Sequence, residues 1–448
     1  MAITLVYHNN PGGNCFVDLG VAAFDMTHAG QESYSLSVAD GRHLGSVYGD
    51  GVIDLMGLGH GPHGFAGVGR NSSKPGIEPA ISYSRGMGNF SLAFDGFIVN
   101  GDGLREDWGG DSDAELAARF IADANGFEKG ITNLSEAAKG HFCIALVAEG
   151  GQAYAARSPL GVRTLIYGEG PKGRAVVSES RALSHIGMRM VRDLEAGEIA
   201  EIDGSGLHTM KRLTGKRHVC SFLWPYYQMP DCVVEGVPVA LVKDRIGGYL
   251  GRMDRADGIG IDVACPVPDS GKGYEEGYAE TYGCAHAELL KKYQYAGRSY
   301  ERPGQSFRDL IAGVKLTVIP HKVRGKRIAA FDDSIRRGTQ LVREGGPIDL
   351  LKSAEPREVH VRICSPRNIA YCRCSPPEGG VYKDHELAAN RFPNDMDLAN
   401  HFDPADRKVK SVRFIGIEPF VSCITEGSSL TRADLCLGCY TGDFGFLE

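Results

Sequence analysis

The stretch from Arg327 to Thr339, RIAAFDDSIRRGT, constrains this chain more than any other. A short apolar run, Ile328 to Phe331, has the length and composition of a buried strand, and Asp332 and Asp333 follow it at once. A small loop with a hydroxyl and a glycine comes next, and a helical pattern begins at Leu341. Such a loop directs backbone N–H groups at an anion, while carboxylates at a strand end accept hydrogen bonds from sugar hydroxyls. The stretch predicts a site for a phosphorylated sugar; the alternative is a surface turn with two solvated aspartates.

Composition excludes several classes of protein. A length of 448 residues favours two domains, and 42% hydrophobic with 23% charged residues is typical of a globular chain. The net charge of −7 argues against general binding of nucleic acid. The sequence has neither an apolar run long enough to span a membrane nor a secretory start, which favours a cytoplasmic location. The twelve cysteines are irregularly spaced in a long chain, so we expect some to bind a metal or cluster rather than to form a disulfide framework.

A second loop supports the sugar-phosphate interpretation. The run from Gly260 to Gly271, GIDVACPVPDSG, predicts a strand that enters a tight loop, with a helix after it; a plain strand–turn–helix is the alternative. Together, PDSG and DDSIRRGT resemble the loops of type I phosphoribosyltransferases, and most of all the amidophosphoribosyltransferase family, where the second loop is usually DDSIVRGTT. In this chain Arg336 replaces the valine and Gln340 the second threonine, so a different phosphorylated sugar stays open.

The resemblance assigns roles to three loops of this half. It implies that the first loop binds pyrophosphate through backbone amides and that the second binds a sugar 1-diphosphate complexed with Mg²⁺. It also implies a flexible loop, from Tyr295 to Leu316, that closes over the donor, although a solvated basic loop is the alternative. The implied residues are Pro268, Asp269, Ser270 and Gly271; Asp332, Asp333, Ser334, Ile335, Arg336, Arg337, Gly338 and Thr339; and Arg298 and Lys315 as contacts of the leaving pyrophosphate.

The first half resembles the glutaminase domain of the same family in the order of its motifs. These motifs are HAGQES from His28, GVGR from Gly67, FDGFIVN from Phe94, DSDAE from Asp111, SPLGVR from Ser158 and VVSES from Val176. The resemblance implies an N-terminal-nucleophile (Ntn) αββα sandwich, followed by an α/β type I phosphoribosyltransferase domain. We place the boundary in the charged stretch Lys211–Lys216, which gives domains at residues 1–216 and 217–448.

The glutaminase chemistry of the family does not carry over with the motifs. Its nucleophile is an N-terminal cysteine, whereas this sequence starts Met1-Ala2-Ile3-Thr4, and Cys15 precedes the HAGQES motif too closely to serve. Asp95 stands where the family has the oxyanion-hole asparagine, and a carboxylate repels a developing negative charge. We therefore expect an inactive glutaminase with a degenerate glutamine site, whose residues serve structure or bind a glutamine-like ligand. The site comprises Arg70, Asp95, Gly96 and Asp113.

The cysteines of the second half include the tail motif CLGC, Cys436 to Cys439. A single CxxC is a weak metal signal, but with Cys220 and Cys372 the set resembles the four ligands of the structural [4Fe–4S] cluster in one class of the family. Zinc or unligated thiols are the alternatives, and Cys374 is near enough in sequence to compete with Cys372.

The sequence as a whole predicts a phosphoribosyltransferase-type enzyme that joins ammonia or an amine to C1 of a sugar 1-diphosphate and releases pyrophosphate. The donor would be phosphoribosyl diphosphate or a related sugar phosphate, without use of glutamine, in specialised metabolism. Partners would include neither nucleic acid nor membrane, and the family implies a homo-oligomer, either a dimer or a tetramer. The alternatives are a non-catalytic regulatory homologue, and an enzyme on another phosphorylated sugar whose first domain binds an amino-acid substrate or carrier.

Overall fold

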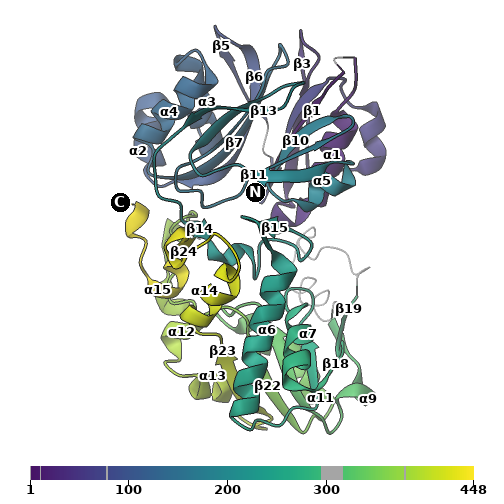
Figure 1. Ribbon diagram of the computed structural model, residues 1–448. Helices are drawn as coiled ribbons and strands as arrows, with labels where there is room; N and C mark the ends of the chain where they lie inside the picture. The colour runs from purple at the N-terminus through teal and green to yellow at the C-terminus, as the bar shows by residue number, and fades with distance from the viewer. Residues whose placement is uncertain (1, 11, 77–78, 294–315, 378–379, 448) are drawn as a thin grey trace.

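The computed structural model describes residues 2–10, 12–76, 79–293, 316–377 and 380–447. They form an N-terminal unit of two antiparallel sheets and a C-terminal unit around a parallel sheet, drawn above and below one another in Figure 1. Among these residues, no helix has the length and apolar character needed to cross a membrane.

The N-terminal unit has four layers. A seven-stranded sheet lies face to face with a six-stranded sheet. In spatial order, the first sheet contains β11 (Arg189–Asp193), β9 (Ile166–Gly170), β10 (Gly173–Val177), β1 (Ala2–His8), β4 (Ala66–Ser72), β2 (Ser33–Ala39) and β3 (Leu44–Asp50). The second contains β13 (Leu207–Arg212), β12 (Glu198–Ile202), β8 (Ala153–Arg157), β7 (Gly140–Ala148), β6 (Gly88–Ile98) and β5 (Ala80–Ser84).

Alternation along the strands explains these layers. In β1, Ile3 and Leu5 face the core between the sheets, while Ala2 and Val6 face the outer helices. In β6, Phe94 packs under the helices of the second sheet. The outer helices are α1 (Phe16–Asp25) and α5 (Arg181–His185) on the first sheet, and α2 (Gly101–Trp108), α3 (Asp113–Asp123) and α4 (Phe127–Ala137) on the second. This is the αββα sandwich that the sequence predicts.

The C-terminal unit is a five-stranded parallel sheet covered on both faces. Its strands, in spatial order, are β18 (Ala285–His286), β17 (Val263–Pro266), β21 (Arg327–Asp332), β22 (Glu358–Ile363) and β23 (Val409–Phe414). One face packs against α6 (Val239–Ala256), α7 (Tyr274–Tyr282) and α14 (Ile417–Thr425). The other packs against α9 (Pro320–Val323), α10 (Thr339–Val342), α11 (Pro347–Ser353), α12 (Ala388–Arg391) and α13 (Asp395–Phe402).

The chain order of these strands makes a topological switch at β17. The strand that follows it in sequence, β18, lies on one side, and β21 lies on the other. Ligands of open α/β sheets bind outside the carboxyl ends of the strands at such a point. The loops that the sequence assigns to pyrophosphate and to the sugar leave β17 and β21 there. The fold therefore brings the two loops together.

Short strand pairs complete the fold. β14 (Val219–Cys220) pairs in parallel with β24 (Leu435–Cys436), and α15 (Gly438–Thr441) follows β24; Figure 1 shows this group between the two large units. The other pairs are β15 (Val233–Val234) with β16 (Val237–Pro238), and β19 (Leu290–Lys292) with β20 (Leu316–Val318). The last strand of the N-terminal unit ends at Arg212, and the domain boundary after residue 216 stays a prediction.

The helical pattern that begins at Leu341 corresponds to two short helices: α10 starts at Thr339 and ends at Val342, and α11 starts at Pro347. Gly345 has a φ of +68°, and Pro347 has no N–H with which to continue a helix. The helical pattern is therefore interrupted between Val342 and Pro347.

Candidate active site

The centre of the site is a pair of adjacent carboxylates at the carboxyl end of β21. Asp333 is buried, and Asp332 is half-buried beside it. The Ser270 hydroxyl donates to Asp332 Oδ1 at 3.1 Å, so the loop after β17 contacts the loop after β21 directly. The Ser334 hydroxyl donates to Asp333 Oδ2 at 2.5 Å. Two loops 62 residues apart in sequence thus form one polar surface.

Both carboxyl groups hold their protons more tightly than isolated aspartates. Burial raises the pKa of Asp332 well above its usual range, and the charge of Asp333 raises it further. Burial also raises the pKa of Asp333, while the hydroxyls of Ser334 and Ser270 act in the opposite sense. Two close carboxylates of this kind favour the approach of a cation.

Lys243 is a functional candidate that the sequence analysis missed. It lies on α6, is 5% exposed, and donates from Nζ to the carbonyl oxygens of Ser270 (3.3 Å) and Lys272 (3.2 Å). Burial lowers its pKa, while the negative groups near it, Asp333 among them, oppose that shift. The available signal is a lysine one position after Val242, on the apolar side of α6. The Lys243 ammonium group therefore holds the first loop through two of its carbonyl oxygens, and it places a positive charge near Asp333.

The first loop is closely packed against β21. A Cβ on Gly271 would lie 2.1 Å from the carbonyl oxygen of Phe331, so only glycine fits there. The Gly271 N–H donates to the carbonyl of Val267 at 2.9 Å. Asp269 is an exposed member of the loop and forms ion pairs with Lys272 and Lys292. Pro268 precedes it. Of the four predicted residues, Ser270 contacts the acidic pair, and Gly271 packs against Phe331, the residue just before the pair.

The second loop, Ser334 to Thr339, is held by contacts to the C-terminal half. Arg337 forms an ion pair with Glu386 (2.8 Å), and its Nε donates to the Tyr371 hydroxyl at 3.0 Å. The Arg336 guanidinium lies 4.7 Å from the centroid of the Tyr371 ring. Ile335 is buried, whereas Thr339 is exposed; Gly338 has a φ of +82°, where glycine is favoured, just before α10. The remaining predicted residues of the site, Arg298 and Lys315, lie outside the described residues.

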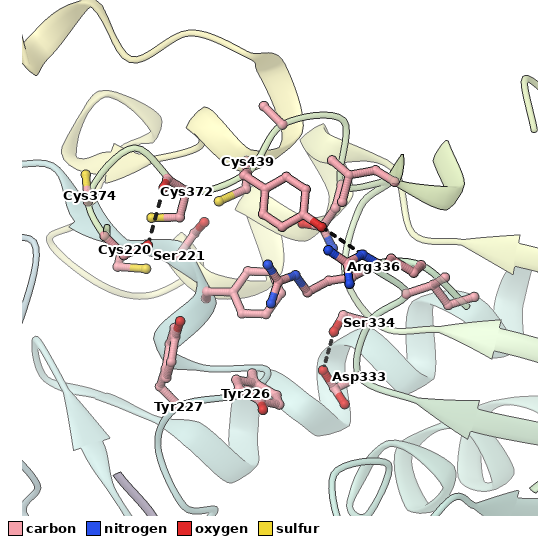
Figure 2. A pocket seen from close by; sticks show the side chains of 18 of the residues that line it. Cys220, Ser221, Tyr226, Tyr227, Asp333, Ser334, Arg336, Cys372, Cys374 and Cys439 are labelled. Carbon is pink, nitrogen blue, oxygen red and sulfur yellow. Dashed lines mark hydrogen bonds between the residues drawn. The ribbon is translucent and has the colours of Figure 1, made fainter. Parts of the chain in front are cut away.

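A cavity of about 780 Å³ connects these loops with the cysteines. Asp332, Asp333 and the second loop form one wall, and Tyr226 and Tyr227 form part of another (Figure 2). The N-terminal unit contributes His141 and Arg163, so the cavity lies where the two units meet. Its volume falls within the range of small-molecule sites in proteins.

Five cysteines line this cavity: Cys220, Cys372, Cys374, Cys436 and Cys439. Figure 2 labels four of them, Cys220, Cys372, Cys374 and Cys439, near one another. They come from three segments of the chain. The segments are tied by protein contacts: β14 and β24 place Cys220 opposite Cys436, and the Ser221 hydroxyl donates to the Cys436 carbonyl at 2.8 Å. The N–H of Ile369 donates to the Cys439 carbonyl at 2.9 Å.

The environment of these thiols suits a metal centre. The pKa of Cys372 is held below its usual range, first by a hydrogen bond with the Cys374 thiol and then by one with Cys439. Burial acts to lower the pKa of Arg163, but Tyr227, Asp95 and the nearby cysteines raise it overall, and its guanidinium lies 4.3 Å from the centroid of the Tyr227 ring. Burial raises the pKa of the Cys220 thiol to about 12.

Four cysteines beside a buried cation are the ligand type of an iron–sulfur cluster. Among the described residues, no three cysteine sulfurs lie within 4.8 Å of one another, and this spacing is wider than a single tetrahedral zinc ion would accept. The predicted ligands Cys220, Cys372, Cys436 and Cys439 nevertheless all line one cavity.

The predicted degenerate glutamine site lies on β4, β6 and α3 of the N-terminal unit. Arg70 and Asp95 are both buried; burial lowers the pKa of Arg70 to about 10, and Asp95 opposes that shift. Asp113 accepts from the Ile98 N–H (3.0 Å) and from Arg105 Nη1 (2.6 Å), so it ties α3 to the end of β6. These contacts give Asp113 a structural role.

Gly96 has a structural role as well. A Cβ at this position would lie 2.2 Å from the carbonyl oxygen of His141 in the paired strand β7. The two cysteines of the N-terminal unit are Cys15, just before α1, and Cys143, on β7; burial raises the pKa of each thiol to about 12. Neither thiol is an ionised, accessible nucleophile. Cys15 also follows β1, a strand paired on both sides within its sheet.

Comparison with known proteins gives consistent results. Residues 71–185 match the model of a family described as a glutamine amidotransferase domain. The amidophosphoribosyltransferase of Archaeoglobus fulgidus is 30% identical over 82% of this chain and 83% of its own, and that of Methanocaldococcus jannaschii is 27% identical over 94% and 92%.

Two solved structures match this chain over nearly its full length. The glutamine phosphoribosylpyrophosphate amidotransferase of Bacillus subtilis, complexed with ADP and GMP, superposes with a TM-score of 0.84 at 26% identity, covering 99% of this chain and 96% of its own. A structure described as the allosteric regulatory enzyme of purine biosynthesis gives a TM-score of 0.83, also at 26% identity, with 99% and 95% covered. The predicted combination of an Ntn sandwich and a type I phosphoribosyltransferase domain is confirmed.

Proposed function

The chain belongs to the amidophosphoribosyltransferase family, and we propose that it transfers a phosphoribosyl group, or a closely related sugar phosphate, from its 1-diphosphate to ammonia or an amine without using glutamine. One observation carries the transferase part of this proposal. The acidic pair Asp332 and Asp333 contacts Ser270 of the first loop at the topological switch of the parallel sheet. This geometry suits a donor whose sugar and diphosphate are held by different loops.

In the proposed reaction, the nitrogen lone pair forms a bond to C1 while the C1–O bond to pyrophosphate breaks. The leaving group carries increasing negative charge, which the backbone N–H groups of the first loop at Asp269 and Ser270 would stabilise. The N–H groups of the loop from Ser334 to Thr339 would hold the sugar phosphate, and Asp332 and Asp333 would orient the sugar hydroxyls. Bound Mg²⁺ would be held by Asp332 and Asp333 and would neutralise charge on the diphosphate.

Two features support a nitrogen source other than glutamine. Strand β1 carries Ala2, Ile3 and Thr4 where the resembled family starts with its nucleophilic cysteine. Asp95 is buried beside Arg70, at the position of the oxyanion-hole asparagine of that family. A carboxylate cannot donate a hydrogen bond to an oxyanion in its ionised form. A role in specialised metabolism is a further part of this proposal.

The cysteine site fits a [4Fe–4S] cluster held by Cys220, Cys372, Cys436 and Cys439. When bound, such a cluster would supply a structural cross-link among the segments that carry these residues. The family resemblance also suggests a dimer or tetramer and a cytoplasmic location, and both stay predictions.

Pyrophosphate release from phosphoribosyl diphosphate tests the proposal. Anaerobically purified protein with Mg²⁺ is assayed with ammonium, with glutamine, and with neither. Asp332→Asn/Asp333→Asn removes the acidic pair, and Asp262→Asn, a carboxylate at the opposite end of the same sheet, is its matched control. We expect release with ammonium only, loss of release in the double variant, and retention in the control. Release with glutamine would contradict the inactive glutaminase, and release unaffected by the double variant would contradict the assigned donor site.

A further inference from the structure

The cavity wall contains a buried asparagine, Asn368, that belongs neither to the acidic pair nor to the cysteines. Asn368 is 5% exposed and lines the cavity together with the second loop. Its Nδ2 is enclosed and has no hydrogen-bond partner among the residues that the structure describes. Buried donors in folded proteins are almost always paired, because burial removes the water that would otherwise accept from them. A molecule bound in the cavity is the available partner for this amide.

The loop that carries Asn368 is fixed on both sides of it. The preceding residue, Arg367, forms an ion pair with Asp395 of α13. The N–H of the following residue, Ile369, donates to the Cys439 carbonyl at 2.9 Å. A side chain between two anchored neighbours is held in place before any ligand arrives, which favours selective recognition.

The strand order places Asn368 on the side of the donor opposite the leaving group. The loop proposed to hold pyrophosphate follows β17, the acidic pair ends β21, and Asn368 lies in the loop after β22, the next strand of the sheet. This loop starts in contact with the acidic pair, because the Cys364 N–H donates to the Asp332 carbonyl at 3.0 Å. A nucleophile attacks C1 from the face opposite the bond that breaks, so a donor whose diphosphate lies towards β17 is approached from the β22 side. Asn368 therefore lies on the side of the nitrogen acceptor.

Ammonia does not match the hydrogen-bonding capacity of this amide. Its single lone pair forms the bond to C1, so ammonia offers N–H donors and no acceptor. Asn368 Nδ2 is itself a donor and pairs only with an acceptor atom such as an oxygen. A neutral oxygen suits the site better than a carboxylate, because Asp332, Asp333 and the diphosphate of the donor all repel an anion at C1.

We propose that the nitrogen acceptor is an amine that carries a neutral carbonyl oxygen, and that Asn368 recognises this oxygen by donating from Nδ2. The inference rests on the proposed transferase function and names its second substrate by class. The amine nitrogen bonds to C1, the C1–O bond breaks with its electron pair leaving on pyrophosphate, and the nitrogen then loses one proton to water. Asn368 orients the amine and takes no part in these bond changes. Glutamine falls outside the class, because its amine lies next to a carboxylate.

Pyrophosphate release from phosphoribosyl diphosphate and Mg²⁺ tests the inference with three amines of the same size. Glycinamide carries a neutral carbonyl, glycine a carboxylate, and isobutylamine no oxygen; ammonium is included, and rates are expressed per unprotonated amine. The full-length wild type is compared with Asn368→Leu and with Asn368→Asp, which both remove the Nδ2 donor, the second without changing the shape of the side chain. Asn89→Leu, at an exposed position of β6, is the matched control. Urea denaturation reports stability.

We expect kcat/KM for glycinamide to exceed the values for isobutylamine and for glycine about 10-fold or more in the wild type and in Asn89→Leu. In both Asn368 variants, the ratio of glycinamide to isobutylamine should fall to about 1–3. The stability of Asn368→Leu should stay close to that of the wild type, because Nδ2 donates to none of the described residues.

Equal use of glycinamide and isobutylamine by the wild type, or a preference for glycine, overturns the inference. An unchanged ratio in both Asn368 variants also overturns it, and a raised KM for phosphoribosyl diphosphate in them would then assign the amide to the donor. A clear loss of stability in Asn368→Leu would make the amide structural and overturn the inference as well. In each of these cases release with ammonium leaves the proposed function standing, whereas no release with any nitrogen source overturns both.

Discussion

The acidic pair gives a prediction in which binding and stability move in opposite directions. Replacing Asp333 by asparagine keeps the size of the side chain and an acceptor for the Ser334 hydroxyl, but removes one of two close negative charges. Because burial raises the pKa values of Asp332 and Asp333, the ionised pair is unfavourable in the metal-free fold. We therefore expect Asp333→Asn to abolish donor-dependent pyrophosphate release and to stabilise the metal-free protein.

The magnitude of the expected stabilisation follows from the repulsion between the two carboxylates. Two like charges about 5 Å apart at an effective dielectric constant of about 20 repel by about 3 kcal/mol. Lys243 and the hydroxyls of Ser270 and Ser334 offset part of this repulsion. A gain of about 1–2 kcal/mol in the free energy of unfolding remains, which is typical when a functional group is neutralised. For a domain of this size that gain corresponds to a melting temperature about 2–8 °C higher.

The raised pKa values also give the direction in which the stability difference changes with pH. A carboxyl group whose pKa is raised by folding stabilises the fold below its unfolded pKa, and this contribution is lost as pH rises through the folded pKa. The stability of the wild type should therefore fall relative to Asp333→Asn as pH rises from about 4 towards 8.

Differential scanning calorimetry in EDTA measures this difference. Asp262→Asn is the matched control: Asp262 pairs with Arg327 at 2.7 Å, which lowers its pKa, so its contribution appears above the unfolded pKa and is lost as pH falls. The control should lower the melting temperature at neutral pH. If Asp333→Asn also lowers it, or if its advantage shrinks as pH rises, the two carboxylates do not repel and the reasoning is refuted.

Three further changes test other parts of the structure. Tyr371→Phe removes the hydroxyl that accepts from Arg337 Nε, and should raise the KM for the donor about 2- to 10-fold with little change in kcat, as steady-state kinetics would show. Gly96→Ala forces a Cβ against the His141 carbonyl and should lower the free energy of unfolding by about 1–3 kcal/mol, measured by urea denaturation, while ammonium-dependent activity is retained. Asp254→Asn leaves the buried Arg362 without its carboxylate (2.6 Å) and should cost about 3–5 kcal/mol in the same urea assay. Equal stability of that variant and the wild type would contradict the assigned role of the pair.

The sequence predicts those parts of the site that lie within a single loop. The acidic pair and its loop are recognisable because strand, carboxylates and glycine follow one another within thirteen residues, from Arg327 to Thr339. The helical pattern after it does not give the helix bounds, because Gly345 and Pro347 divide it into α10 and α11. The tail motif identifies Cys436 and Cys439 for the same local reason.

Contacts between distant segments are not available from such patterns. Lys243 becomes a candidate only once α6 packs under the loop at Ser270. The hydrogen bond from His141 to Cys374 joins a strand of the first unit to a turn of the second, and no periodicity encodes it. Register is the physical reason: the pairing of β6 with β7 places His141 at the end of its strand, and only the assembled sandwich directs it towards the cysteines.

The turn at Tyr371 to Cys374 shows how the remodelled donor loop is accommodated. Arg336, which replaces the valine of the resembled family, packs against the Tyr371 ring, and Arg337 donates to the hydroxyl of the same residue. Cys372, a proposed cluster ligand, follows directly in the chain. A displacement of this turn would therefore move a support of the donor loop and a cluster ligand together, because only one peptide bond separates them. The added positive charge at Arg336 is thus built into the wall that the donor site shares with the cysteines.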